Sequence, residues 1–243
     1  MRFELDEYQG FVKKLMDSGY RTISFADPGA RDTSAPNLLL RHDIDMDPAA
    51  ALPMAEAENA IGARSTYYVL LSNRHTNPFD TEFRASVRRL AELGHWIGLH
   101  FDATQYGLTH DSPGFNEHVG MECELLSRLC GVDVDSVSFH RPARDLLSSP
   151  GSLTHPLPHT YEHVFLKEIE YCSDSAGRWA YGPPTTREAI SKLRPFHFLT
   201  HPISWGSDGS TPSERVAAWI IRRAGDDFVY ELPDAPNPFG DLG

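Results

Sequence analysis

Two aspartates follow a short apolar run near the start of the chain. Asn37–Leu40 is compact and mostly apolar, and it ends in Arg41-His42-Asp43-Ile44-Asp45. Residues two apart in an extended segment point to the same side, so Asp43 and Asp45 face one cavity. Close carboxylates repel each other unless a cation separates them. One aspartate can ligate a metal ion while the other takes a proton from water; the alternative is a pair of solvated acids beside the helix start at Asp47-Pro48.

Three more segments end in residues that bind metals or transfer protons. Trp96–His100, Val134–Phe139 and Phe196–Thr200 are predicted to be strands. In barrels and open α/β sheets, ligands bind beyond the carboxyl ends of the strands. Four strand ends therefore bring titratable residues to one rim, namely Asp43, Asp45, His100, Asp102, His140, Arg141 and His201.

Two of these strand exits suggest a metal ligand and a partner for the first aspartate. A neutral imidazole at the position of His100 can bind zinc or a similar ion. Asp102 points the same way, as a second ligand, as an acceptor behind a ligand, or toward substrate. Arg141 lies at a strand mouth, because Pro142 ends the strand. We expect Arg141 to be a buried partner that keeps Asp43 ionised; a surface salt bridge is the alternative.

The remaining candidates concern the leaving group and the substrate. His201 precedes Pro202 at a strand end, and we expect it to be a general acid that protonates a leaving amine. A purely structural histidine is the alternative. Asp174 lies in the predicted loop Ser173–Trp179, from which it can orient His201. Trp179, in the same loop, can form a wall of a sugar-binding site.

The predicted strands alternate with predicted helices along the chain. Such alternation indicates a parallel sheet covered by helices. Six or seven strand–helix units favour an α/β fold, a distorted, incomplete (β/α) barrel of about seven strands, with a doubly wound open sheet as the alternative. Tyr161–Phe165 is a weaker, strand-like run. The capping boxes Thr185-x-x-Glu188 and Thr211-Pro212-x-Glu214 predict two helix starts, the second helix ending near Arg223.

No linker divides the chain, so residues 1–243 are predicted to form a single catalytic domain. The motif-bearing core spans residues 37–202. The proline-containing tail, residues 225–243, is predicted to be peripheral.

Composition excludes several classes of protein. The chain of 243 residues has 34 Asp and Glu against 22 Lys and Arg, a net charge of −12 that disfavours nucleic acid as a partner. No run approaches the roughly 20 apolar residues of a membrane span, and acids occupy the place of a signal-peptide core. A cytoplasmic protein with three buried, reduced cysteines is therefore expected. Oligomeric state is not indicated.

Taken together, the motifs resemble the polysaccharide deacetylase family, also called carbohydrate esterase family four, over residues 37–202. His42-Asp43-Ile44-Asp45 is similar to its first motif, and Gly94–His100 to its second. The third to fifth motifs resemble Arg141-Pro142, Asp174–Trp179 and Leu199-Thr200-His201. The family fold is a distorted (β/α) barrel, in agreement with the pattern of elements.

One position departs from the family pattern. The second motif of the family normally has another metal-binding histidine four residues after His100, and this chain has Thr104 there. His140 is the best replacement as third metal ligand, and Asp102 is the second choice. Strand alternation weighs against His140, because it and Arg141 should point to opposite faces.

The resemblance implies metal-assisted amide hydrolysis, with one divalent ion, zinc by default. Asp45, His100 and a third residue would hold the ion, Asp43 would be the base, and His201 the acid. The expected reaction removes an N-acetyl or related acyl group from an amino sugar or glycan precursor. Two alternatives are a hydrolase of another small amide or ester and a non-catalytic glycan-binding homologue, the latter suggested by Thr104.

Overall fold

Seven parallel strands form one sheet at the centre of the computed structural model, which describes residues 1–142, 156–180 and 182–231. The order is β5-β4-β3-β2-β7-β6, while β1 pairs with the beginning of β2 beside β3. Within these residues the sheet does not close, so the predicted distorted, incomplete barrel of about seven strands is confirmed. The strands are β1 Arg21–Thr22, β2 Asn37–Ile44, β3 Thr66–Val69, β4 Trp96–Phe101, β5 Val134–Phe139, β6 Glu170–Ser173 and β7 Phe196–Thr200.

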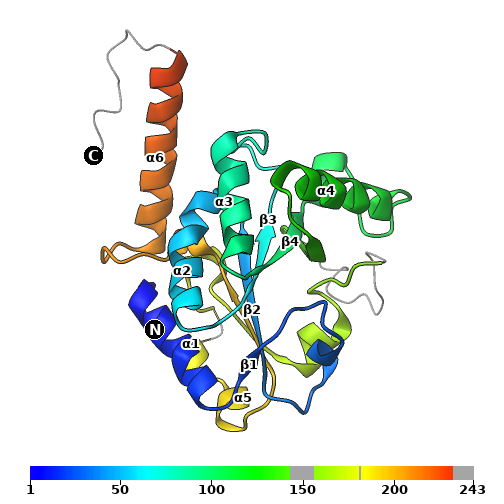
Figure 1. The fold of residues 1–243 in the computed structure, drawn as a ribbon, viewed down its shortest axis with the longest axis vertical. Coiled ribbons are helices and arrows are strands. Elements are labelled where there is room, and N and C mark those ends of the chain that lie inside the picture. Colours follow the sequence, from blue (N-terminus) through cyan, green and yellow to red (C-terminus); the bar gives the residue numbers. More distant parts are fainter. Residues whose placement is uncertain (143–155, 181, 232–243) are drawn as a thin grey trace.

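Helices cover the outer face of this sheet (Figure 1). Apolar residues of α3 and α4 pack on β3, β4 and β5, and those of α1 pack on β2 and β7. In both figures the last helix, α6, projects beyond the sheet and the other helices. The helices are α1 Leu5–Asp17, α2 Leu52–Ala60, α3 Thr81–Glu92, α4 Phe115–Cys130, α5 Glu188–Ser191 and α6 Pro212–Glu231.

The central strand, β2, is buried along its whole length and has two different faces. Leu38 and Leu40 pack with α1 on the outer face, whereas Leu39 packs with Phe25 and Tyr68 on the inner face. Because alternate residues share a face, Arg41 and Asp43 belong to the inner face. This alternation determines which polar side chains reach the site.

Three expectations for the second half of the chain are wrong. Tyr161–Phe165 is not a strand: a turn of π-helix occupies Val164–Glu168, and β6 follows it. A short apolar run cannot be assigned to strand or helix by its pattern alone. The box at Thr185 does not cap a helix, since α5 is a single turn whose N-cap is Arg187.

The predicted helix end near Arg223 is the third correction, because α6 continues through residues 225–231 as helix. That the tail is peripheral stays a prediction. The start of α6 is as expected: Thr211 and Glu214 exchange the hydrogen bonds of a capping box. Gly225 costs only about 1 kcal/mol relative to alanine, and no proline occurs between Pro212 and Pro233. Residues 232–243 lie outside the described part. Within the described residues, no helix is long and apolar enough to cross a membrane.

Candidate metal centre with a flanking acid and base

The inner face of β2 carries a buried ion pair. Arg41 donates from Nε to Asp43 Oδ1 at 2.8 Å and from Nη2 to Asp43 Oδ2 at 2.7 Å. Both residues are at most 3% exposed. Nη2 of Arg41 also donates to the Tyr161 hydroxyl at 3.1 Å. Burial would raise the pKa of Asp43, but the adjacent guanidinium outweighs it and lowers that pKa.

Arg41 thus occupies the place predicted for Arg141 as the buried partner of Asp43, and that prediction is wrong. Arg141 is exposed, and its backbone has a φ of 46°. This left-handed conformation turns the chain just after β5 and directs the arginine outward. Arg41 was missed, although its position two residues before Asp43 on one strand was a usable signal.

Turning Arg141 outward leaves His140 on the inner side, next to two other candidate ligands. His140 Nδ1 lies 3.2 Å from His100 Nε2 and 3.4 Å from Asp45 Oδ1. His100 Nε2 is 3.1 Å from the same oxygen. The three candidate ligand atoms lie within 4.8 Å of one another. The conflict between His140 and Arg141 therefore disappears, because only His140 faces inward.

The chemistry of this group fits a divalent cation. Asp45 Oδ1 is buried and accepts no hydrogen bond, although two imidazole nitrogens lie beside it. A buried carboxylate oxygen without a partner is costly. A cation between one carboxylate oxygen and two imidazole nitrogens would satisfy all three atoms, and this donor set is typical of zinc and similar ions.

Ser138 fixes the orientation of His100. Its hydroxyl lies 2.5 Å from His100 Nδ1, which leaves Nε2 to face Asp45. Such a contact behind a metal ligand sets both the tautomer and the ring orientation. Ser138 was not singled out from the sequence, although it lies two residues before His140 on the same face of β5.

Asp102, the alternative third ligand, is engaged elsewhere. Its Oδ1 accepts hydrogen bonds from the backbone and the hydroxyl of Thr104, and its Oδ2 accepts one from Gln105. Asp102 therefore caps the short helical turn that follows β4. It is not part of the three-residue group, and Thr104 serves its cap rather than the metal centre.

On the other side of Asp45, His201 is held by a buried aspartate. Asp174 Oδ1 lies 2.6 Å from His201 Nδ1, and Asp174 Oδ2 accepts from the His201 backbone and from Trp205 Nε1. His201 Nε2 is 4.0 Å from Asp45 Oδ2. Burial would lower the pKa of His201, but the charge and hydrogen bond of Asp174 raise it to about 9.

Trp179 does not take the position expected of it. Its ring stacks on Phe3 with centroids 5.4 Å apart and packs against Phe198 and Trp205. Its Nε1 donates to the carbonyl of Met1. The indole therefore belongs to the apolar cluster under α1, because the start of the chain folds over it, and not to a wall of the site.

Behind the site, the outer face of β2 carries a second polar cluster. His42 lies 2.9 Å from Glu58 Oε1 and 2.7 Å from the Thr200 hydroxyl. Tyr8 and Tyr67 also donate to Glu58. Glu58 and His42 are completely buried. His42, part of the motif that contains both aspartates, therefore faces away from the candidate metal centre.

Two cavities open beside the candidate metal centre, and Asp45 lines both. One, of about 430 Å³, includes His201 and the first turns of α6. The other, of about 340 Å³, includes His140 and Asp102 and is lined by several polar side chains. Asp45 is therefore reached from two separate cavities.

No protein-family model and no curated protein matches the sequence. Solved structures similar to this chain include a Streptococcus pyogenes deacetylase, PplD, in complex with acetate, with 11% identity over 88% of this chain and 85% of that chain and a TM-score of 0.43. A family 4 acetyl xylan esterase from Clostridium thermocellum, in complex with a cobalt ion, has 13% identity, 84% and 95% coverage and a TM-score of 0.40. The T48 deacetylase with substrate has 18% identity, 82% and 87% coverage and a TM-score of 0.38. Likeness at this level carries no information on the activity of this chain.

Proposed function

We propose that this chain is a metal-dependent hydrolase that removes an N-acetyl or related acyl group from an amino sugar or glycan precursor. One arrangement carries the proposal: Asp43 and His201 flank the candidate metal centre from two directions. Asp43 Oδ2 lies 3.8 Å from His100 Nε2, and His201 Nε2 lies 4.0 Å from Asp45 Oδ2. A base and an acid on either side of a Lewis acid are what amide hydrolysis requires.

Asp45, His100 and His140 would hold the ion. When bound, a divalent cation such as zinc would polarise the substrate carbonyl and lower the pKa of a water molecule, so that this water loses a proton more readily and becomes a better nucleophile. The residues around it have separate tasks. Ser138 holds His100 in position, and the backbone nitrogen of His140 donates to the carbonyl of Phe101, which fixes the start of the turn after β5.

Asp43 is suited to the role of general base. The two hydrogen bonds from Arg41 keep its carboxylate ionised and fix its plane. A carboxylate in this state can accept a proton from the attacking water as the new carbon–oxygen bond forms. It does not need to ligate the ion, because Asp45 supplies that oxygen.

His201 is suited to the role of general acid. With a pKa of about 9, its imidazole carries a proton at neutral pH. Asp174 binds Nδ1, so Nε2 is the atom that can donate a proton. An amide nitrogen must be protonated before it can leave. A buried Asp–His pair whose Nε2 faces the centre therefore supports cleavage of a carbon–nitrogen bond.

A protein that only binds glycans needs neither a base nor an acid. The Arg41–Asp43 and Asp174–His201 pairs remove charges from water, which is costly, and one member of each lies within 4.0 Å of a candidate ligand. We therefore prefer hydrolysis over a purely binding role. Thr104, which suggested that role, is instead part of the Asp102 cap.

Acetate release is the test of this proposal. The protein should be purified without chelator, its metal content measured, and zinc, cobalt, nickel and manganese supplied in turn. Acetate is then assayed with N-acetylglucosamine, its short oligomers and simple acetamides. We expect one divalent ion per chain and metal-dependent acetate release that Asp43→Asn and His201→Gln each reduce. Release that is unaffected by EDTA, or no binding of any of the four metals, would overturn the proposal.

A further inference from the structure

The first half of α6 is fixed against the body of the chain along one side. Arg215 donates from Nη1 to the carbonyls of Phe3 and Ser204, at 2.8 and 3.0 Å. One turn later, Trp219 is 6% exposed and donates from Nε1 to Asp47 Oδ2 at 2.9 Å. Residues four apart lie on one side of a helix, so these two contacts set the rotation of α6 about its axis.

That rotation presents a different side of α6 to the cavity of about 430 Å³. Ser213, Val216, Ala217 and Ile220 follow the spacing of a helix face, and all four line the cavity. Much of its wall is apolar, formed by Met46, Ile203, Pro212, Val216, Ala217 and Ile220. Ile220 is 41% exposed, an unusual exposure for a large aliphatic side chain at the mouth of a polar site.

The position of His201 shows which part of a substrate this cavity would receive. His201 and Asp45 line it together with one side of α6. If His201 protonates the departing amine, the part of the substrate attached to that amine extends from His201 along α6. The smaller cavity lies toward His140 and Asp102 and does not include His201.

We propose that the amine part of the substrate carries an apolar group, such as an alkyl, aryl or lipid substituent, which packs along the Val216–Ile220 side of α6. An apolar wall offers few hydrogen-bond partners to sugar hydroxyls, whereas it gains from each methylene removed from water. Ile220 is then a specificity-determining residue. This inference rests on the proposed hydrolase function and adds to it the chemical class of the substrate.

The test uses β-glycosides of N-acetylglucosamine with methyl, butyl and octyl groups, at concentrations below that at which octyl glycosides form micelles. Each methylene buried against α6 is expected to raise kcat/KM up to about fourfold, so the octyl compound should exceed the methyl compound by at least tenfold. Ile220→Asn should reduce this ratio to near one. Ile221→Asn is the matched control: Ile221 is 44% exposed and is not among the lining residues, so the ratio should remain.

Calorimetry with EDTA-treated protein provides a second measurement that does not need turnover. Octyl glycoside should bind more tightly than methyl glycoside, and Ile220→Asn should remove the difference. If acetate is released equally from all three glycosides, the inference is overturned while the hydrolase function stands. If neither these glycosides nor the substrates tested above release acetate, the hydrolase function fails, and equal binding of the glycosides would overturn the inference independently. If kcat/KM is the same for all three glycosides, and light scattering shows a dimer that Ile220→Asn dissociates, this side of α6 is an interface between two copies of the chain. That result would also overturn the inference.

Discussion

Arg41 and Asp43, two residues apart on β2, are joined by two parallel hydrogen bonds in the interior of the molecule. The guanidinium also lies over the ring of Tyr161, 4.9 Å from its centroid. Paired and bonded in this way, a buried carboxylate stays charged at low cost. Breaking such a pair leaves an uncompensated charge, so the relationship can be tested from either side.

Replacing Arg41 should damage both folding and catalysis. Arg41→Gln leaves the Asp43 carboxylate without its cation, and we expect it to destabilise the fold by roughly 3–5 kcal/mol. Arg41→Lys keeps the charge but not the two-point contact and should fold better. In both variants the pKa of Asp43 rises, so the acid limb of the pH–rate profile should move to higher pH. Arg141→Gln is the control, because Arg141 is exposed; an equal shift of the acid limb in that variant would contradict the assignment of Arg41.

Asp43, on β2, and Asp45, just after it, should have different roles: Asp43 acts as the base, and Asp45 binds the metal. Asp43→Asn removes a proton acceptor, so turnover should fall by roughly 10² or more while the metal remains bound. Asp45→Ala removes the oxygen that lies between the two imidazoles, and metal binding should be lost. Elemental analysis and acetate release on the same preparations measure both effects. Near-normal turnover of Asp43→Asn on a confirmed substrate would show that the base lies elsewhere.

His140 should be required for metal binding, whereas Thr104 should not. His140→Ala leaves only Asp45 and His100, and we expect metal affinity to fall by roughly 10² or more, judged against the 10- to 100-fold loss caused by removing a contact behind a ligand. Thr104→Ala removes only a hydrogen bond to Asp102 and should leave metal affinity nearly unchanged. Competition with a chromophoric chelator measures both. A metal-bound structure with Asp102 in the place of His140 would refute this assignment.

Glu122 on α4 should make the fold less stable as pH rises. Burial raises its pKa from 4.5 to about 7, and its Oε2 is buried without a hydrogen bond. The folded state therefore binds the proton of the Glu122 carboxyl more tightly than the unfolded state does. The contribution of the protonated carboxyl to the free energy of unfolding is complete below pH 4.5 and is lost as pH rises to about 7. That loss is roughly 3 kcal/mol at most, at 1.36 kcal/mol per pKa unit.

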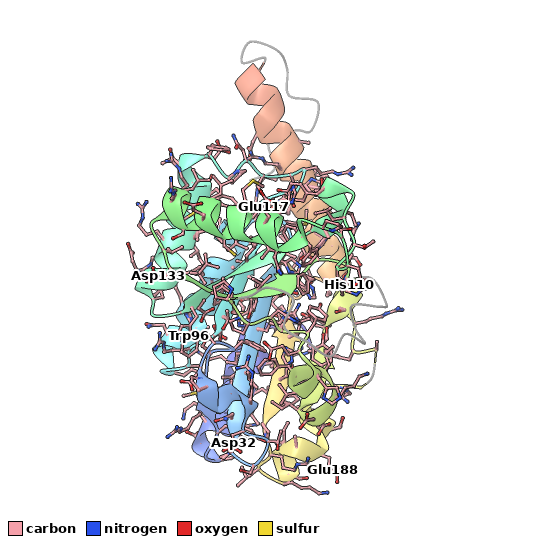
Figure 2. All side chains as sticks on the ribbon, turned by 90° about the vertical axis from the view of Figure 1, so that its right-hand side faces the viewer. Asp32, Trp96, His110, Glu117, Asp133 and Glu188 are labelled. Carbon is pink, nitrogen blue, oxygen red and sulfur yellow. The ribbon has the colours of Figure 1, made fainter. Side chains whose placement is uncertain are left out.

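Glu122→Gln tests this, because a glutamine cannot ionise. The difference in unfolding free energy between variant and wild type, from urea denaturation, should change in favour of the variant between pH 4.5 and 7.5. Glu117→Gln, at an exposed position of the same helix (labelled in Figure 2), should give a curve parallel to that of wild type. Parallel curves for wild type and Glu122→Gln would show that Glu122 is ionised in the fold throughout this range.

Much of the site could be predicted because parallel strands bring their carboxyl ends to one edge. That rule alone places Asp43, Asp45, His100 and His201 close together, without any knowledge of loops. The same alternation rule that paired the aspartates also applied to Arg41, so its contact with Asp43 was within reach of sequence reasoning. Their roles in catalysis and metal binding remain predictions.

Other parts depended on contacts between distant segments, which no local pattern records. Trp179 packs on Phe3 because the start of the chain folds over β7. The outward direction of Arg141 depends on one backbone angle after β5. The role of α6 beside the site follows from Arg215 and Trp219, whose partners lie more than a hundred residues away or across a loop.

The back-to-back arrangement on β2 has a consequence for how this gene can change. His42 serves the buried cluster around Glu58, while its neighbours Arg41 and Asp43 serve the site on the opposite face. Inserting one residue before Arg41 would reverse the faces, placing a charged pair against Tyr8 and α2 and the imidazole of His42 in the position of the base. Deleting one residue would reverse the faces as well and place Ile44 in that position. A point substitution in this strand changes one side chain, and its effect on activity can be small. A change of length moves every side chain that follows it to the other face. Homologues that keep the activity should therefore conserve the length of β2 more strictly than its residues.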